Sequence, residues 1–545
     1  MNRTPFDTPS PQPQPESSNT PWYATPQAPK ISYSTMDGLF AWLSLLLGFL
    51  TIRALPISRY PLGGMLVLVL LFAFGGVYLR VSGIRAERRA ILIALLSAIL
   101  SVGMLTNGNH TIQFCVFLFL TLVFFCWIYD LCGLAGKKLS PDSLFSHLLC
   151  ALFRSPWKHF GALFPAMGSI GKQSARGRRF WQTLGWIALG LLCAVVPTAV
   201  IALLLSYDSQ FTSLLKDLFS FSWDGFGEFL GDAILSIPAA ILFFGGLFAV
   251  KRQREQQKEN SSDAPPISFA FLRILPRALL CAAVTPVLIL YVLFFISQWS
   301  YYVSAFTHVL PEGLTYAAYA RDGFFQLCAV CAINAVMLWV FHVMARRSPS
   351  GRGVIQRIYS GLISVFTLIL ISTALSKMIL YIGTYGLTQK RVYASWAMLV
   401  LAVIFIAVLL RQIFRRFPTA PTVLIATVAL FALIALPNVD GVIASYNVNH
   451  YLSGDLTEMD VYALEDLGVS AVPAAIKLEK ELSQRNTPDK LTDEERTILY
   501  QTSAYLNAIT VDLRVREEKQ NGVERIFSFS IPTARARALL EEREN

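Results

Sequence analysis

The chain has 545 residues, of which 54% are apolar and only 15% are charged, and its mean hydropathy is +0.52. This composition excludes a water-soluble enzyme, because soluble chains carry a larger share of charged residues. The formal net charge of +11 does not indicate nucleic-acid binding, because the basic residues lie in short loops between apolar segments. Inside lipid, such long apolar segments satisfy their backbone groups as helices.

The first 35 residues contain eight prolines among Gln, Ser and Thr, and no apolar run that would build a core. This composition predicts a disordered cytoplasmic tail over residues 1–35. The segment lacks the basic start, the short apolar stretch and the small-residue cleavage site of a signal peptide. We therefore expect the first membrane helix to stay in place as an anchor.

Residues 36–437 alternate apolar segments with short polar breaks, a pattern that predicts an all-α, polytopic transmembrane helix bundle. A helix needs about 20 residues to cross a hydrocarbon core about 30 Å thick. Eleven segments approach this length, give or take one, and the third and eleventh are the shortest. The predicted spans are residues 37–54, 62–79, 90–105, 111–130, 181–206, 233–250, 278–298, 324–345, 359–383, 393–412 and 422–437.

Lys and Arg gather in alternate loops of this predicted bundle. They cluster within residues 80–89, 137–179, 251–258, 346–357 and 411–416, whereas the intervening loops hold few. Positively charged loops stay on the cytoplasmic side, where anionic lipid of the bilayer also attracts them. Eleven crossings then place the amino terminus in the cytoplasm and the chain beyond the last span outside the cell.

Residues 438–545 differ in charge from the membrane block, with 12 Lys and Arg against 19 Asp and Glu. They predict a small extracytoplasmic helical domain, of a kind that commonly binds partners. Helix-start signals mark where its helices begin. The expected elements are a helix capped by Asp455 or Thr457 and ending at Leu467, a helix from Pro473 to Leu482, a helix from Thr492 with Glu495 to about Val515, an extended piece from Glu524 to Ser530, and a helix from Pro532 to Glu544.

Motifs for chemistry are largely missing from the sequence. None of the eight cysteines lies beyond residue 331, so no disulfide framework is predicted for the external domain. Cys328 and Cys331 form a C-x-x-C in an apolar helix, where small packing residues are the better interpretation than a metal site. The six histidines are scattered, and Gly161–Lys172 departs from the spacing of a phosphate-binding loop. We therefore predict no metal and no cofactor.

Lys377 is the most informative residue of the membrane block. It lies in an apolar segment, where an unpaired ammonium costs several kcal/mol, on the order of 2.5–3.5 by insertion scales. Tyr381 and Tyr385 follow at helical spacing and share its face. Asp440 and Asp232 are the acidic candidates at matching depth. Lys377 therefore predicts either a functional site or a structural clamp between helices.

Three stretches of the carboxyl-terminal half resemble signatures of bacterial multi-pass membrane proteins grouped as domain-of-unknown-function family 4173 and its relative 4153. The resemblance covers residues 300–545 and implies a cell-membrane location without an assigned activity. Ala318 departs from the family pattern, which commonly has an acidic residue there. The matching residues are Tyr319, Arg321, Gly323 and Phe324; Tyr385, Gly386, Leu387, Thr388, Arg391 and Tyr393; and Asn438, Asp440 and Asn447.

The predicted topology puts all three stretches on the outward side, where they can converge. A cationic, aromatic-rimmed cavity there suits an anionic group such as a phosphate, a carboxylate or a lipid head. A network of polar contacts that joins the tail to the bundle uses the same residues and is the competing interpretation. The cluster comprises Tyr319, Arg321, Lys377, Tyr381, Tyr385, Thr388, Arg391, Asp440 and Asn447.

Three classes of function fit these features. The favoured class is a membrane scaffold or sensor whose external domain binds a ligand or a protein partner and whose basic loops face the cytoplasm. The second class is a transporter or flippase for an anionic or lipid-linked solute, although no internal repeat is evident in the sequence. A membrane-embedded transferase is third, with Asp322 and Asp440 as its candidate acids.

Overall fold

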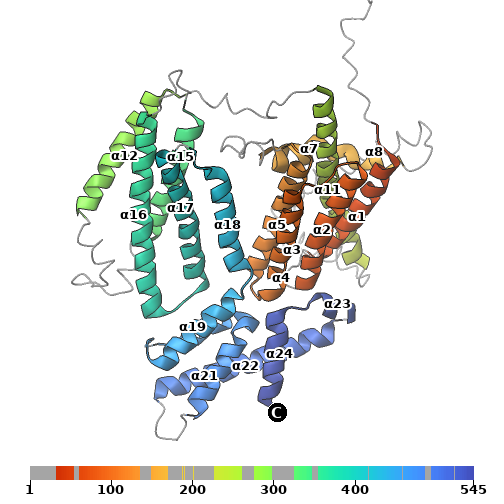
Figure 1. Ribbon diagram of the computed structural model, residues 1–545. Helices are drawn as coiled ribbons and strands as arrows, with labels where there is room; N and C mark the ends of the chain where they lie inside the picture. Colours follow the sequence, from red (N-terminus) through yellow and green to blue (C-terminus); the bar gives the residue numbers. More distant parts are fainter. Residues whose placement is uncertain are drawn as a thin grey trace, which may run out of the picture.

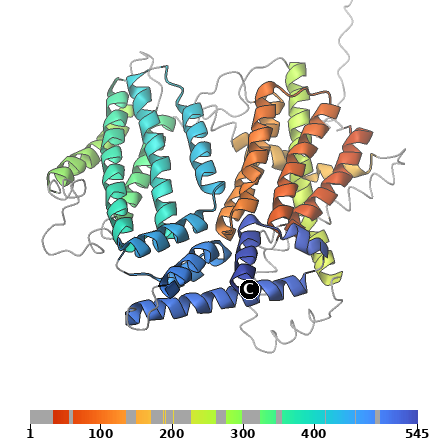
Figure 2. The same ribbon diagram turned by 60° about the horizontal axis from the view of Figure 1, so that its bottom comes forward.

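The computed structural model describes residues 32–54, 60–134, 149–169, 226–260, 275–297, 324–345, 354–414, 416–456, 458–484, 492–520 and 522–544, with the single residues 187, 190 and 201. Two groups of long helices stand side by side, and the helices of the carboxyl-terminal tail lie across one end of both groups (Figures 1 and 2). The amino-terminal end of α1 lies at the opposite end of the molecule from this tail (Figure 1).

The first group contains the amino-terminal helices and one long helix from the middle of the chain. Short helices pack against its end, and large aromatic side chains fill its core, among them Phe124 and Phe244, which are fully buried. Its long elements are α1 (Thr35–Ala54), α2 (Pro61–Val81), α3 (Arg88–Ser101), α4 (Gly103–Thr106), α5 (His110–Leu131) and α11 (Phe226–Asn260). Its short elements are η1 (Cys150–Arg154), α7 (Ser155–Lys158), η2 (Phe160–Ala162) and α8 (Leu163–Met167).

The second group has a core of its own. Phe341, Phe405 and Leu370 are buried there between neighbouring helices. Asn334 crosslinks its neighbours, because it accepts a hydrogen bond from the Tyr291 hydroxyl at 2.6 Å and donates to Thr367 at 2.9 Å. The elements are α12 (Arg277–Ser297), α15 (Phe324–Val343), α16 (Val354–Tyr385), α17 (Gln389–Ile413) and α18 (Thr419–Ala435).

Helices α1 and α11 run antiparallel along their whole shared length. An ion pair closes each end of the pair: Arg53 with Asp232 at 2.8 Å, and Asp37 with Lys251 at 2.7 Å. Between them Gly48 allows close approach, because a Cβ added there would lie 2.6 Å from a backbone oxygen of α11. The two ion pairs show that α11 begins at the tail end of the bundle and leaves it at the far end.

Nine helices of the described residues are long and apolar enough to cross a membrane. Helix α18 and the helix that follows it, Val439–Ser453, meet at an angle of 63°, and if this bent pair counts as one span the described residues hold up to ten. This agrees with an integral membrane protein built as an all-α helix bundle. Most of the predicted fifth span, residues 181–206, lies outside the described residues. The total of eleven spans therefore stays a prediction.

Two membrane elements show features that were not expected. The predicted third span, residues 90–105, is present within Arg88–Thr106 but is interrupted at Val102, between α3 and α4. The basic stretch 251–258, expected as a loop, continues the helix α11 to Asn260. Lys251 is consequently a helical residue that points into the bundle and not part of a solvated connection. Helices α11 and α12 also continue through Pro238 and Pro286.

All the described elements of the tail are helices, joined by short links. The Thr492–Glu495 capping box and the predicted final helix are confirmed. The first short helix is capped by Asp460, so the expected cap at Asp455 or Thr457 was wrong; Thr457 lies outside the described residues. The elements are α19 (Val439–Ser453), α20 (Val461–Glu465), η4 (Gly468–Ala471), α21 (Val472–Gln484), α22 (Asp493–Lys519), α23 (Gly522–Phe527) and α24 (Ile531–Glu544).

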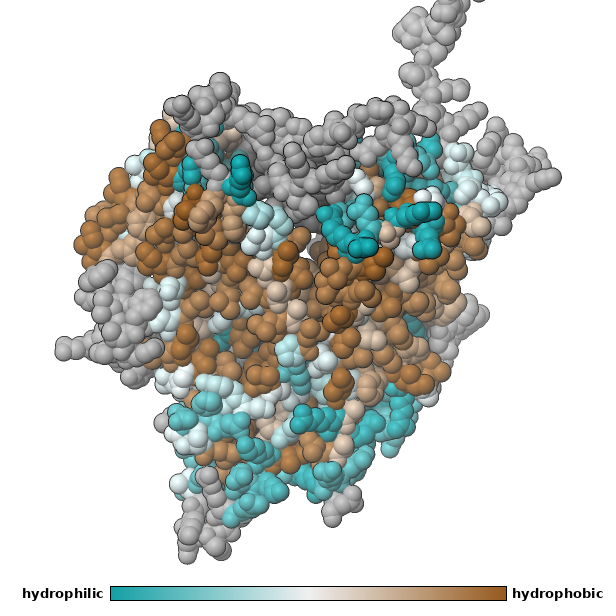
Figure 3. Space-filling view, viewed as in Figure 1, coloured by the Kyte–Doolittle hydropathy of each residue, from teal (hydrophilic) through white to brown (hydrophobic). Residues whose placement is uncertain are grey.

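The tail shares a hydrophobic core with the membrane helices. Buried side chains of α21 and α24 such as Leu478, Ala536 and Leu540 belong to the same cluster as Leu68 and Met104 of the first group. The surface changes at this boundary: apolar residues cover the long helices, and hydrophilic residues gather over the tail (Figure 3). The tail is therefore packed firmly against one end of the bundle.

Candidate functional site

The turn between α16 and α17 brings several predicted site residues together. Gly386 follows the end of α16 with a φ of +73°, a left-handed conformation that favours glycine. Thr388 then caps α17, because its hydroxyl accepts a hydrogen bond from the Arg391 backbone N–H at 3.4 Å. The sequence Tyr-Gly-Leu-Thr thus ends one helix and starts the next within three residues.

Arg391 folds its side chain back onto α16. The guanidinium lies 4.1 Å from the Tyr381 ring centroid and donates hydrogen bonds to the carbonyl oxygens of Tyr385, at 2.9 Å, and of Gly386. Tyr381 and Tyr385 pack edge to face with their centroids 5.3 Å apart. These contacts place the cation at the carbonyl end of α16, where the helix dipole favours positive charge.

Asn447 fixes the tail helix α19 to this turn. Its Oδ1 accepts a hydrogen bond from the Leu387 N–H at 2.7 Å, and its Nδ2 donates to the Leu387 carbonyl at 2.8 Å. One side chain therefore satisfies both backbone groups of a turn residue that lies outside either helix. The close packing also explains Gly386, since a Cβ there would lie 2.6 Å from Asn447 Oδ1.

Asp440, near the start of α19, is the most buried of the predicted site residues that the structure describes, at 2% exposure. Its carboxylate accepts hydrogen bonds from Asn109 Nδ2, at 3.1 and 3.2 Å, and from Gln389 Nε2, at 3.1 Å. Asn109 also donates to the Tyr393 hydroxyl at 3.0 Å, and its Oδ1 caps α5. Among the described residues Asp440 makes no ion pair, and the side chains that donate hydrogen bonds to it are neutral amides.

We call the set Asn109, Gln389, Tyr393, Asp440 and Asn447 the tail junction. It connects three parts of the molecule: α5 of the first helix group, α17 of the second group, and α19 of the tail (Figure 1). Sequence reasoning did not include Asn109, Gln389 or Tyr393 in a site cluster. Two signals were available: Tyr393 matches the family pattern, and Asn109 caps an apolar helix, although such caps mark many helix starts.

Lys377 lies half-buried on α16, one helical turn before Tyr381. The two carboxylates expected as its partners are held by other residues. Asp232 pairs with Arg53 in the first helix group, and Asp440 is held by Asn109 and Gln389. Tyr319, Arg321 and Asp322 lie outside the described residues. The residues of the predicted anion cavity that the structure describes thus lie on α16, α17 and α19 and in the turn between α16 and α17.

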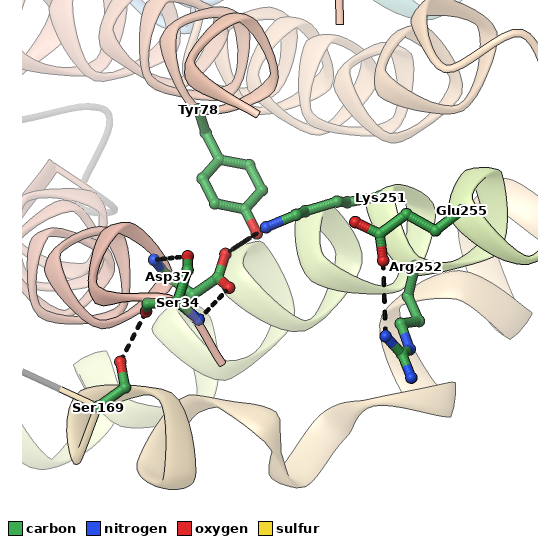
Figure 4. Close-up of polar contacts among 7 residues, drawn as sticks. All are labelled: Ser34, Asp37, Tyr78, Ser169, Lys251, Arg252 and Glu255. Atoms are coloured by element: carbon green, nitrogen blue, oxygen red, sulfur yellow. Dashed lines mark hydrogen bonds and ion pairs between the residues drawn. The ribbon is translucent and has the colours of Figure 1, made fainter. Parts of the chain in front are cut away.

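A second polar cluster, missed by sequence reasoning, lies at the far end of the first group (Figure 4). The Asp37 side chain, 3% exposed, pairs with Lys251 Nζ at 2.7 Å and accepts a hydrogen bond from the Tyr78 hydroxyl at 2.8 Å. Ser34 completes it through reciprocal bonds: its N–H donates to Asp37 Oδ2 at 2.9 Å, and its Oγ accepts from the Asp37 N–H at 3.1 Å.

The Asp37 cluster ties α1, α2 and α11 together and satisfies both oxygens of the buried carboxylate. The sequence contains one indication of this cluster, namely the spacing Ser34-x-x-Asp37, which is typical of a capping box. Lys251 gave no such sign, because it follows a long apolar run and looks like a loop residue. No group of three metal-binding side chains occurs in the described part of the chain.

Comparison with known proteins gives one family. A family model described as Domain of unknown function (DUF4153) matches residues 90–478. This range contains the tail junction and Lys251 but not Asp37. The expected relationship to family 4153 is confirmed, while the likeness to family 4173 stays a prediction. No curated protein and no solved structure matches the chain.

Proposed function

The chain belongs to the family described as Domain of unknown function (DUF4153), and from that premise we propose that it is a sensor or scaffold of the bacterial cell membrane. In this proposal the tail, residues 438–545, binds a partner outside the cell. The helix groups carry the signal to basic residues on the cytoplasmic side. We also propose that the chain is related to family 4173 and that its amino terminus lies in the cytoplasm.

The single observation that carries the proposal is the position of the Asp440 carboxylate. It links the tail helix α19 to α5 through Asn109 and to α17 through Gln389. A buried carboxylate that loses its donors is costly, because its charge stays away from water. The junction therefore favours two discrete arrangements, closed or fully opened to solvent, and a displaced tail acts on both helix groups at once.

The tail also presents side chains suited to a protein partner. Tyr462 on α20 and Tyr500 on α22 are 66% and 77% exposed, and these two helices contact each other. Tyrosine is enriched in protein interfaces because it adds a large apolar ring with a polar end. The acidic balance of the tail, with 12 basic and 19 acidic residues, favours a partner with a basic surface.

The coupling is tested by removing the charge of Asp440. Fluorophores introduced as noncanonical amino acids at Glu87 and Ile413, both exposed residues away from the tail, report the distance between the two helix groups in lipid nanodiscs. We expect Asp440→Asn to shift or broaden this distance distribution, and the exposed control Asp466→Asn to leave it unchanged. An unchanged distribution in Asp440→Asn contradicts the coupling.

The orientation is tested separately. The tail holds no cysteine, so Glu518→Cys at an exposed position of α22 introduces a unique thiol there. We expect a membrane-impermeant maleimide to modify the tail peptide of intact cells. Modification only after permeabilisation places the tail inside and removes the external partner from the proposal.

A transporter or flippase for an anionic or lipid-linked solute is the second candidate. Lys377 favours it, because a half-buried cation on the apolar helix α16 suits an anionic substrate. The two functions differ in what they require. A transporter reconstituted in vesicles loses uptake when Lys377→Met is introduced and keeps it when the tail partner is absent, whereas a sensor depends on the tail.

A further inference from the structure

The tail carries an apolar edge, residues 522–531, at the boundary with the membrane helices. It comprises α23, the short link after it and the first residue of α24. Four apolar side chains project from it without cover: Val523 at 63% exposure, Ile526 at 61%, Phe529 at 47% and Ile531 at 48%. Such a concentration of exposed apolar residues is unusual on a soluble surface and marks an interaction site.

The apolar edge lies against the beginning of a membrane span. Tyr60 lies one residue before α2, and its hydroxyl donates a hydrogen bond to the Glu524 carboxylate at 3.3 Å. Phe527 packs against Gly63: a Cβ added to Gly63 would lie 3.8 Å from the Cβ of Phe527. The helix α24, which starts at the end of this edge, contacts α4. The edge is therefore held at the level where α2 enters the membrane.

Its apolar surface continues the lipid-facing side of α2. Gly63 lies on the same face of α2 as Leu66 and Leu70, which follow at helical spacing and are 38% and 46% exposed. In a helix that crosses a membrane these exposed leucines face lipid. Phe527 covers Gly63 at the end of that stripe, so the four uncovered side chains extend the stripe beyond the end of the helix. Figures 1 and 2 show α23 at the margin of the tail, beneath the ends of α1 and α2.

Charged residues frame the edge in the manner of an interfacial segment. Arg525, which also pairs with Glu517, and Arg535 are exposed beside the apolar residues. Long arginine side chains reach lipid phosphates while their stems lie on apolar surface. The carboxylate of the edge, Glu524, is turned toward Tyr60, which keeps an anion away from the phosphates.

We propose that the apolar edge lies in the interfacial region of the bilayer and anchors the tail to the lipid surface. The occupant of this surface is lipid, namely the boundary between headgroups and acyl chains beside α2. Membrane binding of this kind scales with the apolar area that is buried. The tail is then held by two attachments, the tail junction at α19 and the lipid at α23, and the length of α22 separates them.

Photo-crosslinking tests this proposal on the full chain. The photoreactive residue p-benzoylphenylalanine replaces Ile526 or Phe529, and the protein is reconstituted in vesicles of phosphatidylcholine and phosphatidylglycerol. Tyr462 and Tyr500 are matched control positions, since both are exposed tail residues. We expect the yield of lipid adduct at Ile526 and Phe529 to exceed that at Tyr500 by about tenfold, because insertion places the side chain among acyl chains.

Hydrogen exchange gives a second measurement that does not depend on the photoreactive probe. Ile526→Asp should raise the hydrogen-exchange rate of amides 522–531 in vesicles about tenfold, because a carboxylate is expelled from the interface. Tyr500→Asp should leave these amides unchanged. Adduct yields equal to that at Tyr500, a crosslink to protein in place of lipid, or unchanged exchange in Ile526→Asp would each overturn the lipid anchor.

Discussion

Asn447 and Leu387 exchange two hydrogen bonds, at 2.7 and 2.8 Å, and so pair a side-chain amide of the tail with the backbone of the α16–α17 turn. The Asn447 side-chain amide thus pairs with the N–H and C=O of Leu387 in the way that backbone groups of neighbouring β-strands pair with each other. It attaches α19 to the second helix group at a point where the chain has no helical hydrogen bonds of its own.

We expect Asn447→Ala to loosen this attachment at a cost of about 1–3 kcal/mol, because both Leu387 backbone groups lose a partner in a half-buried place. The matched control is Asn449→Ala on the same helix, since Asn449 is exposed and accepts a hydrogen bond from Lys477 at 2.7 Å. Hydrogen exchange of the Leu387 amide should rise in the first variant and stay unchanged in the second. Equal exchange in both would show that the pair does not hold the turn.

Two glycines of the same region should respond in opposite directions. Gly386→Ala forces a Cβ into a left-handed backbone and against Asn447 Oδ1, with a strain of about 1–2 kcal/mol from the backbone alone. Gly383, three residues earlier on α16, has open space where an added Cβ would lie, so Gly383→Ala should stabilise the helix by about 0.5–1 kcal/mol. Thermal unfolding in detergent distinguishes them, and a neutral Gly386→Ala would refute the packing described for this turn.

The Asp37–Lys251 pair should be sensitive to removal of one partner. Asp37→Leu or Lys251→Met alone leaves a buried charge and should cost about 3–5 kcal/mol. The double variant Asp37→Leu with Lys251→Met should recover much of that loss, because no unpaired charge remains. Tyr78→Phe removes one hydrogen bond and should cost about 1 kcal/mol. Unfolding midpoints of the four proteins test this order, and additive single losses in the double variant would exclude coupling between the two side chains.

The stability of the tail should depend on pH through Glu479. Burial acts to raise the pKa of Glu479, but hydrogen bonds from Arg543 and Ser503 and the Arg543 charge outweigh it and leave the pKa below its usual 4.5. A lowered pKa in the folded state stabilises the fold above pH 4.5, and this contribution is lost as the pH falls through the lowered value.

Glu479→Gln should therefore reduce the stability of the tail at neutral pH and weaken its decline in acid. The exposed residue Glu518 on α22 supplies the control Glu518→Gln. Thermal unfolding of the full chain, followed by circular dichroism over a series of pH values, measures both effects. A decline in acid as steep in Glu479→Gln as in the natural sequence would assign the pH dependence to other carboxyl groups.

Local signals predicted the parts of this molecule that depend on local chemistry. Apolar length located the membrane helices, and Thr492 with Glu495 located the start of α22. The stretch Glu524–Ser530 was predicted as extended, and this was wrong: α23 is a helix to Phe527. An isolated strand leaves its backbone groups unpaired, and no other extended segment lies beside it in the described part of the chain.

Tertiary relationships were beyond the reach of local patterns. Asp37 and Lys251 are 214 positions apart, and no spacing rule connects them. The residues around the α16–α17 turn were expected to be neighbours, and Tyr381, Tyr385, Thr388, Arg391 and Asn447 do lie together. The local pattern did not predict which groups these residues bind. Arg391, for example, donates hydrogen bonds to two carbonyl oxygens of its own turn.

The shared core of the tail and the first helix group bears on how the protein is made. Leu68 and Met104 emerge from the ribosome long before Ala536 and Leu540, which lie in the same cluster. The helices that carry Leu68 and Met104 thus wait for a much later part of the chain before their ends are covered, and contacts of such long sequence separation form slowly. Termination of translation before α24 would leave helices already inserted in the membrane with uncovered apolar ends, a recognisable target for quality-control proteases.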